Sequence, residues 1–187
     1  MIEIVLYIVV GLAVLAGVVA AYASTRPDTM RFARSMRIAA APEAIFPLIN
    51  DLKAFSSWSP FERKDPNIKS VYSGPSSGVG QRHDWDGNKD VGAGWVVVTE
   101  SVAPSRIGMA LTMTRPMACS NQVTFTLVPD GGGATTVTWA MEGQMSFVAK
   151  VLNVVVGMDR LCGPEFEAGL ATLKEKVEVQ SGLSAVA

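Results

Sequence analysis

The stretch that decides the fold is residues 106–142, RIGMALTMTRPMACSNQVTFTLVPDGGGATTVTWAME. In three of its segments apolar residues alternate with small or hydroxyl-bearing ones: Arg106 to Thr114, Asn121 to Val128, and Thr135 to Glu142. A two-residue period places alternate side chains on opposite faces of a strand. These segments therefore predict antiparallel strands, each with one apolar face that another layer must cover.

More strands precede this stretch, with two short helices before them. Apolar residues bounded by turn formers predict strands over Arg31 to Ala39, Ile68 to Ser73, Gly80 to Trp85 and Gly92 to Ser101. Pro42 opens a helix that continues to Asn50, because proline is favoured in the first helical turn. A second short helix is expected over Leu52 to Trp58.

The covering layer is expected at the C-terminal end, where residues 146–179 have a helical period. Phe166, Leu170, Leu173 and Val177 form an apolar stripe at steps of three and four residues. Interruptions are expected at Gly157 and at Gly163-Pro164. The order of strand, two short helices, six strands and long helix predicts an α+β domain. Its curved antiparallel sheet would wrap around the last helix and leave a cavity between them.

The first 23 residues have a different character. Ile4 to Ala23 contains neither charge nor proline, and twenty helical residues span about 30 Å, the thickness of the hydrocarbon layer. We predict one transmembrane helix over residues 4–23, followed by a linker over 24–30. A buried core helix would show a polar face, which is missing here. A cleaved signal peptide remains open, since Ala21-Tyr22-Ala23 resembles a cleavage site, although no basic residue precedes the apolar run.

Basic residues after this helix predict its orientation. Arg26, Arg31, Arg34 and Arg37 follow it closely, whereas its N-terminal flank carries only Glu3. By the positive-inside rule, the C-terminal side stays in the cytoplasm. We therefore predict a single-pass protein of the inner or cell membrane with a cytoplasmic soluble domain over 31–180 and a disordered tail over 181–187.

Composition excludes several kinds of function. The 187 residues have a net charge of −1 and a pI of about 5.8, which argues against nucleic-acid binding. With His83 as the one histidine, a histidine-rich metal site is excluded. The two cysteines, Cys119 and Cys162, are expected to be reduced core residues. The glycine-rich turns lack the lysine and the strand-to-helix context of phosphate loops, so no cofactor is expected.

At this point the residues resemble a known superfamily. Residues 38–46, IAAAPEAIF, are followed by Asn50-Asp51-Leu52, then by Trp58-Ser59-Pro60, by Gly78-Val79-Gly80 before Trp85, and by Val137-Thr138-Trp139 before a long helix. This succession is similar to the SRPBCC or helix-grip superfamily, which includes START-like lipid carriers, birch-pollen-allergen-like proteins and bacterial polyketide cyclase/dehydratase-like proteins. The resemblance covers about residues 31–179 and implies a cavity for a small hydrophobic ligand.

Inward-facing residues are the candidates for lining that cavity. By strand phase and helical stripe they are Trp85, Met109, Leu111, Met113, Asn121, Val123, Phe125, Trp139, Met141 and Phe166. Most of these would equally serve as ordinary core. Asn121 is a polar group on an apolar face and could orient a ligand oxygen.

His83 is a weak candidate for a catalytic acid or base, because its pKa lies naturally near neutrality. It shares a strand face with Gln81 and Trp85, whereas Asp84 and Asp86 should face away, so the spacing supports no His–Asp relay. An ordinary strand histidine is the alternative.

Three functions follow from these features. The first is a membrane-anchored binding or carrier domain for a small hydrophobic ligand, either a lipid or a polyketide-like molecule. The second is a cyclase or dehydratase-type enzyme in which His83 or a carboxylate at the rim of the cavity moves protons. The third is a membrane-tethered interaction module that binds no ligand.

Overall fold

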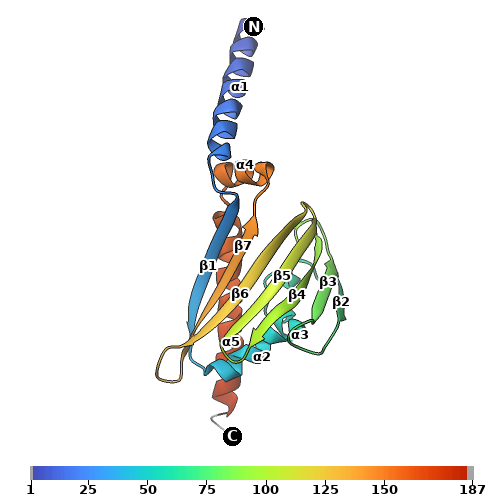
Figure 1. Cartoon of the computed structure of the whole chain (residues 1–187), viewed down its shortest axis with the longest axis vertical. Helices are drawn as coiled ribbons and strands as arrows, with labels where there is room; N and C mark the ends of the chain where they lie inside the picture. The colour runs from blue at the N-terminus through green and yellow to red at the C-terminus, as the bar shows by residue number, and fades with distance from the viewer. Residues whose placement is uncertain (1, 185–187) are drawn as a thin grey trace.

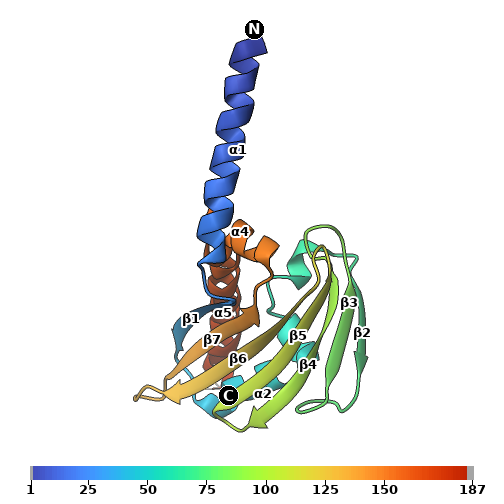
Figure 2. The ribbon, with the colours of Figure 1, turned by 45° about the horizontal axis from the view of Figure 1, so that its top comes forward.

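The computed structural model describes residues 2–184, apart from the side chains at positions 181, 183 and 184. Seven strands form one antiparallel sheet in the order β1-β7-β6-β5-β4-β3-β2. The strands are β1 (Thr29–Ile38), β2 (Lys69–Ser73), β3 (Arg82–Asp86), β4 (Ala93–Val102), β5 (Arg106–Arg115), β6 (Cys119–Pro129) and β7 (Thr135–Gln144). The first strand pairs with the last, and the sheet curves strongly from β1 to β2 (Figures 1 and 2).

The long helix α5 (Met158–Ser184) crosses the concave face of the sheet. The predicted stripe of Phe166, Leu170, Leu173 and Val177 is buried against it. Helices α2 (Pro42–Asn50) and α3 (Leu52–Ser56) and the 3₁₀ turn η1 (Glu62–Lys64) lie on the same side of the sheet and cover a further part of that face (Figure 1). The predicted α+β helix-grip architecture is confirmed.

The C-terminal helical stretch divides at only one of its two predicted interruptions. Helix α4 (Phe147–Val155) ends just before Gly157, whose φ of 82° suits a residue without a side chain. The expected interruption at Gly163-Pro164 is wrong, because α5 runs through both residues. Pro164, the seventh residue of α5, removes the bond that a backbone amide there would make to the carbonyl of Arg160, and the helix continues through this loss near its N-terminal end. Gly163 serves close packing instead, since a Cβ there would lie 2.1 Å from Nη2 of Arg34.

Helix α1 (Ile2–Ser24) extends away from the domain and touches it only near its C-terminal end, where it contacts α4 (Figure 1). It is the one helix within residues 2–184 that is long and apolar enough to cross a membrane. Residues 25–28 connect it to β1. At the other end, α5 continues through Ser184, so it includes the first four residues of the expected tail; residues 185–187 lie outside the described part.

Candidate functional site

Aromatic rings fill the middle of the grip, the space between the concave face of the sheet and α5. Trp139 from β7 stacks on Phe166 from α5, with 3.9 Å between ring centroids and 14° between planes. Trp58, which follows α3, makes edge contacts with Trp139 and Phe125. Packing is tight enough that a Cβ at position 169 would lie 2.8 Å from Cζ3 of Trp139. Six of the ten predicted lining residues belong to this core: Met109, Val123, Phe125, Trp139, Met141 and Phe166.

The concave face opens at the end of the sheet nearest α4. Strand register aligns Trp85, Gly94, Met113 and Cys119 across four neighbouring strands. Gly94 leaves room for Trp85, because a Cβ there would lie 3.1 Å from Cζ2 of that indole. Leu111 lies in the next row. The inward side chains of Trp85, Leu111, Met113 and Cys119 are only half-buried, as is that of Cys162 on α5.

We call these five residues the open end of the grip: Trp85, Leu111, Met113, Cys119 and Cys162. Solvent reaches them although they point to the face that is fully buried elsewhere. Both cysteines are free thiols, as expected, but they are half-buried and do not belong to the buried core. Burial, together with the nearby Glu165 carboxylate, raises the pKa of the Cys162 thiol, so this thiol stays protonated and unreactive at neutral pH.

Three buried polar atoms of the concave face lack hydrogen-bond partners within residues 2–184. They are Oδ1 of Asn121 and the indole Nε1 atoms of Trp85 and Trp139. Asn121 is buried in the row next to Met113 and Cys119, and its Oδ1 lies over Gly143, where a Cβ would come within 1.9 Å. Its amide group makes only a long contact of 3.7 Å with Sγ of Cys119. Buried polar groups are rarely left unpaired, and each one costs about 1–3 kcal/mol.

A polar cluster surrounds His83 beside the open end. The imidazole is buried, stacks on Tyr72 with 4.4 Å between centroids, and lies 3.0 Å from Oγ of Ser70 through Nε2. Oε1 of Glu62 is 3.7 Å from the same nitrogen. Burial lowers the pKa of His83 and raises the pKa of Glu62. The two shifts favour a neutral imidazole beside a carboxyl that holds its proton more readily than usual.

Asp84 points to the other face of β3, as strand alternation predicts, and it pairs there with Arg82; that pairing lowers the pKa of Asp84. The carboxylate that does lie near His83 is that of Glu62, which the sequence did not indicate. Glu62 lies on a turn of three residues, which is too short to show a periodic pattern.

The turn η1 bridges the sheet to α5 beside the open end. Glu62 faces His83 on β3, Lys64 forms an ion pair of 2.7 Å with Glu165 on α5, and the guanidinium of Arg63 donates to Oγ1 of Thr172 at 2.9 Å. These contacts hold η1 across the gap between sheet and helix, so the turn forms one wall of the site.

Two shallow depressions lie on the opposite, convex face of the sheet. One of about 240 Å³ lies over β5 to β7 and is lined by outward residues such as Thr112, Gln122 and Glu142, together with the neighbouring Leu111 and Asn121. The other, of about 260 Å³, lies over β2 to β4 around Val71 and Trp95. Both are open and shallow, and neither contains the His83 cluster.

Comparison with known proteins agrees with this geometry. The family described as polyketide cyclase / dehydrase and lipid transport matches residues 29–178, which include the whole sheet and most of α5. The chain belongs to this family. Its helix α1 lies before the matched region and is an addition to the family domain.

Solved structures share the family fold at low identity. A protein from Chromobacterium violaceum, CV1439, is 20% identical, with a TM-score of 0.55 over 81% of this chain and 99% of that one. Norcoclaurine synthase from Thalictrum flavum, solved with dopamine and hydroxybenzaldehyde, is 13% identical, with a TM-score of 0.61 over 80% and 86%. The Aha1 dimer of Colwellia psychrerythraea is 16% identical, with a TM-score of 0.57 over 80% and 97%. No curated protein matches.

Proposed function

We propose that this protein is a membrane-anchored binding or carrier domain for a small hydrophobic ligand, held at the open end of the grip. The observation that carries the proposal is the set of unpaired polar atoms on the inward face, two of which belong to Asn121 and Trp85 in the two rows of the open end. A fold tolerates such atoms where a ligand supplies their partners. The family, whose description includes lipid transport, supports the same reading.

The chemistry of these rows defines the ligand class. Leu111, Met113 and Cys119 offer apolar contact for a chain or ring. Oδ1 of Asn121 accepts a hydrogen bond, whereas the indole of Trp85 donates one. A hydroxyl group both donates and accepts, so a lipid or polyketide-like molecule with one hydroxyl suits the site best.

Helix α1 supports the anchor. It has the length and apolarity of a membrane span, and none of its central window is buried by the domain. The arginines that follow it favour a cytoplasmic domain. Removal of the domain by protease added outside spheroplasts would contradict that orientation, and a mature chain that begins near Ser24 would replace the anchor by a signal peptide.

Photoaffinity labelling tests the ligand site in the full-length chain. The protein is placed in lipid nanodiscs with a diazirine-bearing fatty alcohol, irradiated, and digested for peptide mass spectrometry. We expect adducts on β5 and β6 around Leu111, in addition to those on α1. The variant L111E should lose the domain adducts, whereas V128E, at an exposed position of β6, should keep them. Adducts confined to α1 in the wild type would refute ligand binding and leave a tethered interaction module.

The His83 cluster favours acid–base catalysis as a second candidate function. A buried imidazole whose pKa is lowered lies 3.7 Å from a carboxyl whose pKa is raised, and such perturbed pairs are the usual candidates for acid–base chemistry. If the domain turns over a polyketide-like chain, H83Q should lower kcat with little change in KM. Full turnover by H83Q would leave binding as the function.

A further inference from the structure

Helix α4 has its polar and apolar faces reversed relative to a helix that faces water. Its nine residues, FVAKVLNVV, include two polar side chains, Lys150 and Asn153. Lys150 is 8% exposed and forms an ion pair with Asp28, and Oδ1 of Asn153 accepts a hydrogen bond from the backbone amide of Met158 at 2.9 Å. Both polar groups are therefore used inside the protein, although a helix on a water-soluble surface turns such groups outward.

The outward side of α4 is apolar. Its exposed residues, with their exposed fractions, are Phe147 (52%), Val148 (60%), Leu152 (43%) and Val155 (66%). Val148, Leu152 and Val155 recur at steps of four and three residues, so they form one continuous face. Leu161, on the first turns of α5, adds another exposed apolar side chain at 55%.

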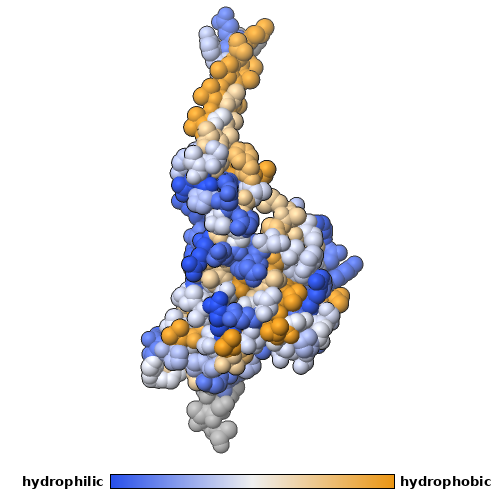
Figure 3. All heavy atoms as spheres, in the orientation of Figure 1, coloured by the Kyte–Doolittle hydropathy of each residue, from blue (hydrophilic) through white to orange (hydrophobic). Residues whose placement is uncertain are grey.

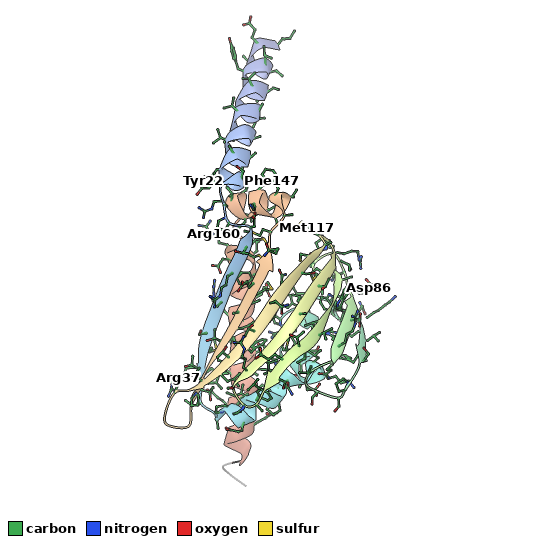
Figure 4. The ribbon with its side chains drawn as sticks, viewed as in Figure 1. Tyr22, Arg37, Asp86, Met117, Phe147 and Arg160 are labelled. Carbon is green, nitrogen blue, oxygen red and sulfur yellow. The ribbon has the colours of Figure 1, made fainter. Side chains whose placement is uncertain are left out.

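This apolar face adjoins the end of the proposed membrane span. Helices α1 and α4 are in contact, and Tyr22 and Phe147 lie at the same level of the molecule (Figure 4). In the space-filling view the apolar surface of α1 and that of α4 lie close together, with paler atoms at the end of α1 beside them (Figure 3). A bilayer that surrounds α1 up to Tyr22 would therefore meet α4 as well.

Three arginines follow these two helices closely in sequence, Arg26 and Arg31 after α1 and Arg160 after α4. Arg26, Arg31 and Arg160 are exposed, and Arg160 lies directly below α4 (Figure 4). Within residues 2–184 none of the three forms an ion pair with a carboxylate, whereas the neighbouring Asp28 is paired with Lys150. Unpaired cations beside an apolar helix suit the phosphate layer of an anionic bilayer.

We propose that α4 is an interfacial helix, which lies in the headgroup layer of the same anionic bilayer that α1 spans. This inference rests on the proposed membrane anchor. It adds a second contact, which fixes the orientation of the domain. The open end of the grip lies at this end of the sheet, near Met117 in the turn between β5 and β6 (Figure 4). Docking through α4 would therefore hold the open end close to the bilayer, from which a hydrophobic ligand could enter without crossing water.

Depth-dependent quenching tests the proposal in the full-length chain. With both native cysteines replaced by serine, single cysteines at Val148 or Val155 are labelled with an environment-sensitive dye, and the protein is placed in nanodiscs of phosphatidylcholine and phosphatidylglycerol. Lipids with a spin label near the headgroup should quench both dyes roughly two-fold more than lipids labelled deep in the chain, because an interfacial helix is only about 5–10 Å deep. L12C in α1 is the deep control, and E175C at the far end of α5 is the aqueous one.

The controls separate the two hypotheses. An unquenched dye at position 12 would refute the anchor itself. A quenched dye at position 12 with α4 sites that behave like position 175 would refute the interfacial helix alone. Disulfide-linked dimers of unlabelled V155C, together with shielding of the dye from lipid in the labelled protein, would show that a second copy covers α4 and would also overturn the proposal. In pure phosphatidylcholine, or with R31Q and R160Q combined, quenching of the α4 dyes should fall; equal quenching would refute the role of the arginines.

Discussion

Replacing Asn121 by leucine should stabilise the ligand-free protein and weaken its capture of ligand. Oδ1 of Asn121 is buried without a partner, and its amide makes only the 3.7 Å contact with Cys119. An unsatisfied buried acceptor costs about 1–3 kcal/mol, and leucine of nearly the same volume removes that cost. Part of the gain is lost, because a methyl group is larger than the oxygen that packs on Gly143. We expect a net stabilisation of about 1–2 kcal/mol.

Thermal unfolding in detergent, followed by near-UV circular dichroism, measures this change. For a domain of this size, about 1 kcal/mol raises Tm by roughly 2–4 °C, so N121L should unfold several degrees higher than the wild type. Q122L is the matched control, because Gln122 is the next residue of β6 and is exposed on the convex face; it should change stability by less than about 0.5 kcal/mol.

Photoaffinity labelling of N121L completes the argument. The variant should lose labelling of β5 and β6 although it is more stable, since the ligand hydroxyl has lost its acceptor. A lower Tm for N121L would mean that the amide oxygen is satisfied in the folded protein. Undiminished labelling would mean that Asn121 does not contact the ligand. Either result would refute the reasoning that unpaired polar atoms mark the site.

Three further changes test other parts of the molecule. Burial lowers the pKa of the His83 imidazole from its ordinary value of 6.5, so as the pH falls this imidazole is protonated in the unfolded chain before it is protonated in the folded one. The stability of the protein should therefore fall as pH drops below 6.5. In H83Q that part of the pH dependence should vanish from thermal unfolding curves. Asp28→Asn leaves the buried Lys150 ammonium without its partner, so it should lower the stability of α4 by about 1 kcal/mol and increase hydrogen exchange across that helix. The loss is small because Asp28 itself is exposed. Unchanged exchange would refute this role of the pair. Gly169→Ala adds a methyl group 2.8 Å from Trp139, and overpacking of about 1–3 kcal/mol should outweigh the helix propensity gained, which a raised Tm would contradict.

Strand alternation predicted the sheet because each strand has one buried face. The same phase put Leu111, Asn121 and Phe125 on the concave side, where the structure has them. The sequence could not show which part of that face is covered by other elements and which part is exposed, because the alternation is the same in both. Phe125 is covered by Trp58, which follows the short helix α3 and is distant in sequence, whereas Leu111 is only half-buried.

Local pattern also fails where a residue's role is set by a distant element. Gly163 looked like a helix breaker, but its missing side chain makes room for Arg34 of β1. Glu62 carried no signal in a turn of three residues, yet the fold brings it to His83. In α4 the residue types alone suggested an extension of the covering helix; the reversal of its polar and apolar faces became visible only with Asp28 in place beside Lys150.

The filled middle of the grip and its open end should differ in how easily they move. Aromatic packing around Trp139 and Phe166 fixes α5 to the middle of the sheet. The open end can therefore bind a ligand without loosening the core. Three polar contacts hold the wall formed by η1: Glu62–His83, Lys64–Glu165 and Arg63–Thr172. The Lys64–Glu165 pair has both side chains partly exposed, and such pairs contribute only about 0–1 kcal/mol. Opening this wall is therefore far less costly than separating α5 from the sheet. Ligand exchange should depend on η1 and α4, the two elements beside the open end, while the aromatic middle stays closed.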